Sequence, residues 1–226
     1  MSPRPPAPDG LIERVIASLD DAHIAHAREE FSALTGSFEP GEPFYEERIR
    51  AFLDWITIER DGGAALRSFL TTERALDADD RALGRALLSS MRSLYRVSAS
   101  EASSEALEGS AVIDCLLHGA RFALRPDGAA ARLRPGDVLD GRAIGIDGVV
   151  LLAPGPVFHP REVHEALDAL LAEARDAGRC DAGILDPLLR MRMRFDRFHS
   201  IRAKHVYRFD ALERTEILAA PWAGAG

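Results

Sequence analysis

The sequence predicts an α+β protein with a helical N-terminal half, a small antiparallel β-sheet or partial barrel, and C-terminal helices. Apolar residues recur at three- and four-residue spacing through most of residues 10–95, which is typical of amphipathic helices. Strand-like runs separated by turn sequences follow between residues 111 and 152, and helical spacing returns after residue 160. The chain has 226 residues, 46% hydrophobic and 28% charged, which is the composition of a folded protein with a sizeable core.

The first helical region follows a short tail. Prolines at positions 3, 5, 6 and 8 predict that residues 1–9 are disordered. From Leu11 the apolar spacing predicts one long helix that stops at Gly36. A second helix is expected from Glu42 to Arg60, and the sequence Asp61-Gly62-Gly63 then breaks it.

Two shorter helices complete the helical region assigned to residues 10–95. One is expected over Ala64–Leu70 and the other over Asp77–Leu94, with the Asp77 side chain as its N-cap. The apolar face of the latter has helical spacing and consists of Leu83, Leu87, Leu88 and Met91.

A small β unit is expected over residues 96–160. His118-Gly119 can form a turn, and Asp147-Gly148 is a strong signal for a two-residue hairpin. Such tight turns join antiparallel neighbours, so an antiparallel sheet is expected. The strand-like runs are Ala111–Leu117, Ala120–Leu124, Val138–Ile146 and Val149–Leu152.

Residues 161–214 are expected to hold the C-terminal helices, followed by a flexible tail over residues 215–226. Pro160 begins the first of these helices, which continues to Gly178. Asp186 is the predicted N-cap of the last helix, with proline at its first helical position. Its apolar face has helical spacing and consists of Leu188, Met191, Phe195, Phe198 and Ile201.

Three short stretches carry a resemblance to known sequences. They are Phe52-Leu53-Asp54-Trp55 leading to Asp61-Gly62-Gly63, Leu133-Arg134-Pro135-Gly136-Asp137-Val138-Leu139, and Gly141-Arg142. They resemble an uncharacterised group of bacterial proteins that sometimes carry a cysteine-rich SEC-C metal-binding tail. The resemblance spans about residues 50–160 and implies the layout of helices followed by strands. This sequence has no cysteine-rich tail, so a metal function is not implied.

Charge is distributed unevenly along the chain. The net charge is −8 and the isoelectric point is near 5.4, which argues against a generally basic nucleic-acid-binding protein. Residues 190–208 nevertheless carry a net charge of +6, which leaves −14 for the rest of the chain. The candidate contacts with a partner or with phosphate are Arg190, Arg192, Arg194, Arg197, Arg202 and Lys204.

This basic helix, residues 187–206, has several interpretations. Its arginines can bind a protein partner or a second copy of the chain. They can also neutralise nucleic-acid phosphates while Phe195, Phe198 and Tyr207 stack on bases. An anionic membrane surface is the least favoured partner. Alternatively the arginines pair within the chain, with carboxylates such as Glu29, Glu30, Glu46, Glu47, Asp54 and Glu59.

Two sets of residues contain side chains suited to catalysis, and neither is assigned a catalytic role. His159, Glu162 and His164 approximate the H-x-x-E-H zinc-protease motif, but the spacing is one residue too long. Residues five apart on a helix lie about 140° apart, so the two imidazoles would not share a face. Cys115 precedes His118 by three residues, and a buried structural cysteine is the simpler interpretation. No catalytic residue is therefore predicted.

Metal and cofactor sites are not predicted either. His23, His26 and Glu30 can share a helix face, but no second E-x-x-H element accompanies them, and a solvated face explains them. The phosphate-binding loop, the dinucleotide-binding glycine motif and the G-x-S-x-G elbow do not occur in the sequence.

The expected compartment is the bacterial cytoplasm. Cys115 and Cys180 are too few and too far apart for a disulfide framework, so both are interpreted as free thiols. No signal-peptide pattern and no apolar run of spanning length occur. Lys204 is the only lysine and alanine is abundant, which is typical of a GC-rich genome.

The sequence thus favours a non-enzymatic cytoplasmic interaction or accessory protein that acts through helical and basic surfaces, with a protein partner or a second copy as its partner. The first alternative is a nucleic-acid-binding protein that uses the basic helix. The second is a small enzyme whose site is assembled from residues distant in sequence.

Overall fold

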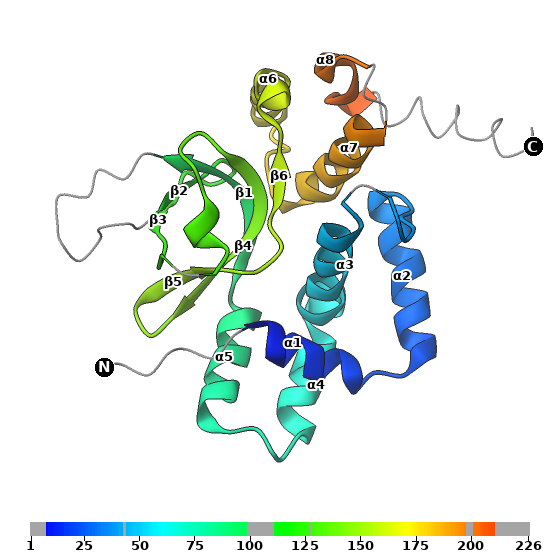
Figure 1. The fold of residues 1–226 in the computed structure, drawn as a ribbon, viewed down its shortest axis with the longest axis vertical. Coiled ribbons are helices and arrows are strands. Elements are labelled where there is room, and N and C mark those ends of the chain that lie inside the picture. The colour runs from blue at the N-terminus through cyan, green and yellow to red at the C-terminus, as the bar shows by residue number, and fades with distance from the viewer. Residues whose placement is uncertain (1–7, 43, 99–110, 127, 198–200, 211–226) are drawn as a thin grey trace, which may run out of the picture.

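The computed structural model describes residues 8–42, 44–98, 111–126, 128–197 and 201–210. It confirms an α+β fold in which helices both precede and follow the strands of the sheet in the sequence (Figure 1). The expected tails over residues 1–9 and 215–226 lie outside these ranges except for Pro8 and Asp9, which are helical and not disordered as predicted, because the first helix begins at Pro8. None of the helices in these ranges combines the length and apolar character that a membrane span requires.

The N-terminal half is helical as expected, but its first helix is divided. The single helix expected before Gly36 is two helices, α1 and α2. The chain breaks because the Ser18 hydroxyl donates to the Val15 carbonyl oxygen at 2.6 Å, and because Asp20 caps α2 by accepting from the His23 amide at 2.7 Å. The helices are α1 (Pro8–Ala17), α2 (Asp21–Thr35), α3 (Tyr45–Asp54), α4 (Ala64–Thr72) and α5 (Ala78–Leu88).

The chain changes its winding after α3. Residues Trp55–Glu59 form a π-turn, in which the amide of Arg60 donates to the carbonyl oxygen of Trp55, five residues back. A 3₁₀ turn over Arg60–Gly62 comes next. The helix expected up to Arg60 is therefore present, with a wider last turn.

Gly63 ends this helical segment. Its φ is 78°, in the left-handed region that glycine adopts without strain. A Cβ at this position would lie 2.7 Å from Leu88 Cδ2 and 3.0 Å from the Ile58 carbonyl oxygen, so the chain also needs the missing side chain for close packing. The predicted break at Asp61-Gly62-Gly63 is confirmed.

Within the described ranges, six strands form the sheet, in the order β3-β2-β1-β4-β5, with β6 also paired to β4. Neighbouring strands are antiparallel, as expected from the turns. Asp147 and Gly148 have φ values of 50° and 76°, as a two-residue hairpin turn between β4 and β5 requires. The strands are β1 (Met91–Ser98), β2 (Val112–Cys115), β3 (Arg121–Ala123), β4 (Val138–Ile146), β5 (Val149–Leu152) and β6 (Val157–His159).

The sheet curls so that its two ends meet. Leu124, just after β3, forms a parallel bridge with Val150 of β5, and the Arg125 amide donates to the Val150 carbonyl oxygen at 2.9 Å. The curled sheet is the small barrel-like unit that the short strands predicted (Figure 1). Its interior contains Tyr95, Val97, Ile113, Cys115, Leu139, Ala143 and Leu152.

Strand β1 lies at the centre of the sheet, where the apolar spacing predicts a helix as far as Leu94. That prediction is wrong beyond α5, and the sheet accordingly begins at Met91. Two serines end the helix: Ser89 Oγ donates to the Ala86 carbonyl oxygen at 3.2 Å, and Ser90 Oγ donates to the carbonyl oxygen of the residue three before it. Such side chains compete with the backbone for the last helical carbonyls.

Helix α5 begins at the predicted N-cap. The Asp77 carboxylate accepts from the Asp80 amide at 2.8 Å. We expect Asp77→Ala to lower the free energy of unfolding by about 1 kcal/mol, because the amide then loses its acceptor. Urea unfolding followed by circular dichroism measures this. Asp77→Asn, which keeps a capping oxygen, is expected to stay close to the wild type, and an equal loss in both variants would contradict the capping role.

The C-terminal helices are α6 (His164–Asp176), α7 (Leu185–Arg197) and α8 (Ala203–Val206). The prediction that Asp186 caps the last helix is wrong. Asp181 instead accepts from the Gly183 amide at 2.8 Å and begins a 3₁₀ turn that leads into α7. Asp186 lies inside the first turn of α7, and its side chain is directed to the central strand β1 instead.

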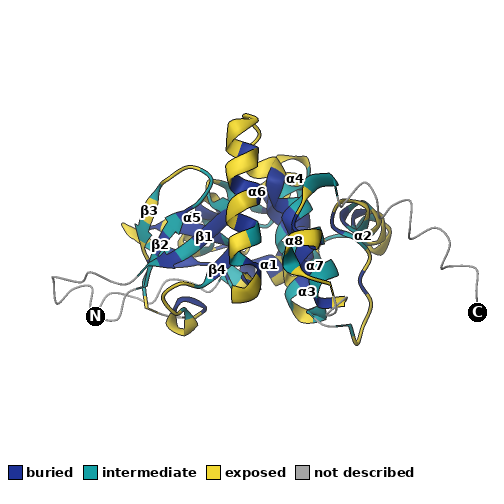
Figure 2. Ribbon diagram, turned by 90° about the horizontal axis from the view of Figure 1, so that it is seen from above, coloured by how far each residue is buried: buried dark blue, intermediate teal, exposed yellow. Residues whose placement is uncertain are grey.

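Helices cover the outer face of the β1–β4 pair with two separate apolar clusters. Ile144 and Ile146 pack with α1, α4 and α5, whereas Leu94 and Val138 pack with α6, α7 and α8. Exposed residues follow the outer side of α6 (Figure 2). The side chains of β4 that lie between these two clusters, Asp140 and Arg142, are charged.

Candidate functional site

Two arginines face each other in the middle of the sheet. In the β1–β4 ladder Arg92 lies directly opposite Arg142, and Arg142 is only 4% exposed. Like charges opposite each other destabilise a pair of strands unless other groups compensate them. The compensation comes from helical elements that lie far away in the sequence.

Glu59 bridges the two arginines. One of its carboxylate oxygens accepts from Arg92 Nη1 at 3.2 Å, and the other pairs with Arg142 Nη2. The π-turn makes this arrangement possible. In an α-helix, side chains five residues apart lie about 140° apart, whereas the i to i+5 hydrogen bonding of a π-turn brings them closer in rotation. Asp54 and Glu59 therefore reach the same guanidinium group.

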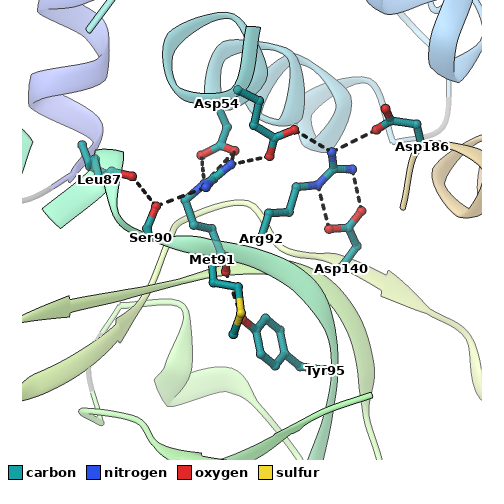
Figure 3. Close-up of polar contacts among 10 residues, drawn as sticks. Asp54, Leu87, Ser90, Met91, Arg92, Tyr95, Asp140 and Asp186 are labelled. Carbon is teal, nitrogen blue, oxygen red and sulfur yellow. Dashed lines mark hydrogen bonds and ion pairs between the residues drawn. The ribbon is translucent and has the colours of Figure 1, made fainter. Parts of the chain in front are cut away.

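Each arginine also has a carboxylate partner of its own. Asp140 accepts hydrogen bonds from Arg92 Nε at 3.0 Å and from Arg92 Nη2 at 2.7 Å. Asp54 accepts from Arg142 Nε at 2.9 Å and from Arg142 Nη2 at 2.7 Å. Asp186 of α7 accepts from Arg92 Nη1 at 3.0 Å (Figure 3). These six residues, two arginines and four carboxylates, form the ion network.

The ion network connects three parts of the fold: the π-turn region, the β1–β4 pair and the start of α7. Burial by itself would lower the pKa of Arg92, but Asp140, Glu59 and Asp186 outweigh it and hold that pKa well above its usual value. The guanidinium group thus stays charged. Bidentate guanidinium–carboxylate pairs of this kind fix orientation as well as charge.

A small cavity borders the ion network. Its volume is about 30 Å³, which is room for a water molecule rather than for a metabolite. It is lined by Arg50, Ala51, Asp54, Arg92, Asp140, Gly141, Arg142 and residues 153–157. The two carboxylates in its lining, Asp54 and Asp140, are both paired with arginines of the ion network. The arrangement fits a structural role.

The zinc-protease-like histidines have structural contacts. His159 lies in β6, is 3% exposed, and places Nδ1 2.9 Å from the Tyr207 hydroxyl oxygen. His164 Nε2 lies 2.9 Å from the His159 carbonyl oxygen. Burial, and then the charge of Arg192, lowers the pKa of His159 to about 3. His159 is therefore a neutral core residue near neutral pH.

Cys115 and His118 have different environments. Cys115 is 2% exposed and its Sγ lies 3.1 Å from Ser93 Oγ, inside the barrel-like unit. His118 is exposed in the turn after β2. Neither residue lines the cavity beside the ion network.

The histidines of α2 form polar contacts at the surface. His26 Nε2 lies 3.0 Å from Glu30, as expected for residues four apart, and Arg60 Nε donates to the same carboxylate at 2.6 Å. The other end of that guanidinium group, Nη1, lies 2.9 Å from His23 Nε2. Among the described residues, no group of three or more His, Cys, Asp or Glu side chains has the arrangement of a metal site.

Arg192, one of the six candidate contacts, is part of the core. It is 4% exposed, its Nε donates to the Phe158 carbonyl oxygen at 2.6 Å, and its guanidinium group lies 4.2 Å from the centre of the Phe44 ring. It also forms an ion pair with Asp196. Arg192 is therefore not on the exposed side of α7.

Two other candidates, Arg190 and Arg197, contact the end of α2 or the segment that follows it, and Arg194 lies between them on α7. Arg190 Nη2 donates to the Ala33 carbonyl oxygen at 3.4 Å, and Arg197 Nη2 pairs with Glu42 at 2.6 Å. Arg194 is half-buried, and its burial, followed by the charge of Arg190, lowers its pKa. Arg197 is the only one of the three that is exposed.

Arg202 and Lys204, at the beginning of α8, are exposed. Neither forms an ion pair with another residue of the described ranges. The aromatic residues beside them are less available: Tyr207 is 2% exposed and Phe195 packs against it at 6.4 Å between ring centres. Phe198 lies outside the described residues.

The ion network was not predicted from the sequence as a unit. Its contacts join residues up to 94 positions apart, and the apolar spacing contains no information about them. One local signal exists: Asp140 and Arg142 occupy alternate positions of an otherwise apolar strand, so both side chains point to the same buried face. A charged pair at such positions indicates partners supplied by another element.

No protein-family model, curated protein or solved structure matches this chain. The resemblance stated for residues 50–160 therefore stays a prediction.

Proposed function

We propose that the chain is a non-enzymatic cytoplasmic accessory protein that binds an acidic protein partner through the exposed segment formed by Ile201, Arg202 and Lys204. The supporting observation is that Arg202 and Lys204 have no carboxylate partner among the described residues, and that they closely follow Ile201, which is 41% exposed. Exposed cations beside an apolar side chain provide both steering and contact area for an acidic surface.

Charge supports the same partner chemistry. The basic segment of residues 190–208 has a net charge of +6 in a chain whose net charge is −8. A cationic surface on an otherwise acidic protein attracts acidic partners at this end and repels them elsewhere, which orients association.

Charge reversal tests the proposal. We expect the wild type to capture one protein from cells of the source organism that the Arg202→Glu/Lys204→Glu variant does not capture. We also expect the captured protein, once purified, to bind the wild type more weakly as the salt concentration increases. The control is Arg132→Glu/Arg134→Glu, which reverses two exposed cations before β4. Equal capture by both variants, or binding that ignores salt, would show that this segment is not the binding surface.

Nucleic-acid binding is the alternative. Exposed Arg197, Arg202 and Lys204 favour it, because phosphate contacts need accessible cations. The burial of Arg192 and Tyr207 argues against nucleic-acid binding, because both were candidates for contacting the nucleic acid. A titration with labelled single- and double-stranded nucleic acid at two salt concentrations distinguishes the two functions, and tight salt-dependent binding would put nucleic acid first.

A further inference from the structure

Two exposed acids lie where the chain enters α6. Glu162 belongs to the 3₁₀ turn η5 (Arg161–Val163), which leads directly into α6, and Glu165 lies in the first turn of α6. Residues three apart on a helical segment are neighbours on its surface, so the two carboxylates project from one side of it. We call Glu162 and Glu165 the acidic pair.

The charged residues next to the acidic pair have other partners. Arg161 Nη2 donates to the Pro135 carbonyl oxygen at 3.3 Å, and Asp168, three residues after Glu165, pairs with Arg96 at 2.7 Å. Neither member of the acidic pair forms an ion pair with another residue in the described parts of the chain. Its two negative charges are therefore available to a partner.

The acidic pair lies close to the exposed cations of the proposed function. We call Ile201, Arg202 and Lys204 the cationic segment. Helix α8, which begins one residue after Arg202, contacts η5, and Val163 of η5 lies in the same apolar cluster as Val206 of α8. Both views place α8 beside α6, at the end of the molecule opposite α4 and α5 (Figure 1, Figure 2). The acidic pair and the cationic segment thus belong to the same end of the fold.

Neighbouring patches of opposite charge make a surface self-complementary. If a second copy is turned by 180° about an axis between the two patches, each patch faces the opposite charge on the other copy. A foreign acidic protein fits this end less well. It would meet the acidic pair while binding the cationic segment, and like charges would repel it there.

We propose that the acidic partner of the cationic segment is a second copy of the chain, whose acidic pair it binds in a two-fold symmetric dimer. This inference rests on the proposed function, because the same cations form the binding surface, and it adds the acidic counterpart and the symmetry. Ile201, which is 41% exposed, contributes apolar area beside the ion pairs. Few residues take part, so the dimer forms reversibly and depends on protein concentration.

The test is sedimentation velocity of the full chain at increasing concentrations up to about 1 mM. We expect the wild type to change from monomer to dimer over this range. The variants Arg202→Glu/Lys204→Glu and Glu162→Lys/Glu165→Lys each place like charges opposite one another, so we expect both to associate at least tenfold more weakly. All four residues are exposed, and urea unfolding verifies that the variants remain folded.

A chain with all four reversals distinguishes specific pairing from a general effect of charge. It has the same net charge as the wild type and again places opposite charges across the interface, so we expect it to dimerise like the wild type. The matched control for the acidic pair is Glu13→Lys/Asp79→Lys, which reverses two exposed acids of α1 and α5. It changes the net charge as Glu162→Lys/Glu165→Lys does, but it is not expected to weaken the dimer.

The outcomes separate this inference from the proposed function. The inference is overturned if the wild type stays monomeric throughout, if Glu162→Lys/Glu165→Lys dimerises like the wild type, or if the fourfold reversal does not restore the dimer. If the wild type is monomeric but captures a different acidic protein through Arg202 and Lys204, the proposed function stands and this inference alone fails. If Arg202→Glu/Lys204→Glu neither weakens the dimer nor changes the captured proteins, both fail.

Discussion

Replacing Arg142 by methionine is expected to lower the free energy of unfolding by about 3 kcal/mol, because removing one partner of a buried ion pair leaves the others uncompensated. Asp54 loses its three hydrogen bonds from the guanidinium group, and Glu59 loses its ion pair with Arg142. The side chains of these carboxylates are 19% and 28% exposed, so water limits the loss to the lower end of the usual range. Urea unfolding at neutral pH measures it.

The matched control is Arg96→Met. Arg96 lies on the same strand as Arg92 and pairs with Asp168 at 2.7 Å, but the two side chains are 36% and 50% exposed. We expect a loss below about 1 kcal/mol, which is usual for surface ion pairs. If the Arg142 and Arg96 variants lost the same free energy, the ion network would not be a main source of stability.

Below pH 6.5 the protein is expected to lose stability through His159. The unfolded chain binds a proton at this histidine near its ordinary pKa of 6.5, whereas burial, followed by Arg192, lowers the pKa in the folded state to about 3. Between these values the unfolded state binds more protons. The contribution of the neutral His159 to the free energy of unfolding is therefore fully present above pH 6.5. It decreases as the pH falls towards 3, by about 1.4 kcal/mol per pH unit.

The variant His159→Gln isolates this effect, because carboxylates also titrate at acidic pH. We expect the difference in free energy of unfolding between wild type and variant to shrink by about 2 to 3 kcal/mol from pH 6.5 to 4.5. His118→Gln, at an exposed turn, is expected to follow the wild type throughout. A difference between wild type and His159→Gln that does not change with pH would contradict the neutral, buried state of this histidine.

Local signals account for the elements that the sequence predicted well. The β4–β5 hairpin follows from two residues, Asp147 and Gly148, whose backbone conformation few other pairs adopt easily. The N-cap at Asp77 likewise depends on a contact three residues away. Strand β1 could not be predicted in this way, because Met91 and Leu94 continue the helical spacing and only the pairing with β2 and β4 decides their conformation.

The charged residues were harder to place than the apolar ones. Composition identified residues 190–208 as basic, but it could not separate the buried Arg192 from the exposed Arg202. That distinction depends on Phe44 and Phe158, which approach from other parts of the chain. The Asp186 side chain shows the same dependence, since its partner Arg92 lies on the central strand.

The carboxylate of Glu59 makes the residues at positions 92 and 142 dependent on one another across three segments of the chain. A relative of this protein that lacked an acid at position 59 would have two facing arginines with no bridge between them, so we expect at least one of them to be replaced there. The π-turn would then no longer be needed to bring a second carboxylate to Arg142, and an α-helix one residue shorter could replace it. Substitutions at these positions should therefore occur together, as a correlated set that an alignment of relatives would reveal.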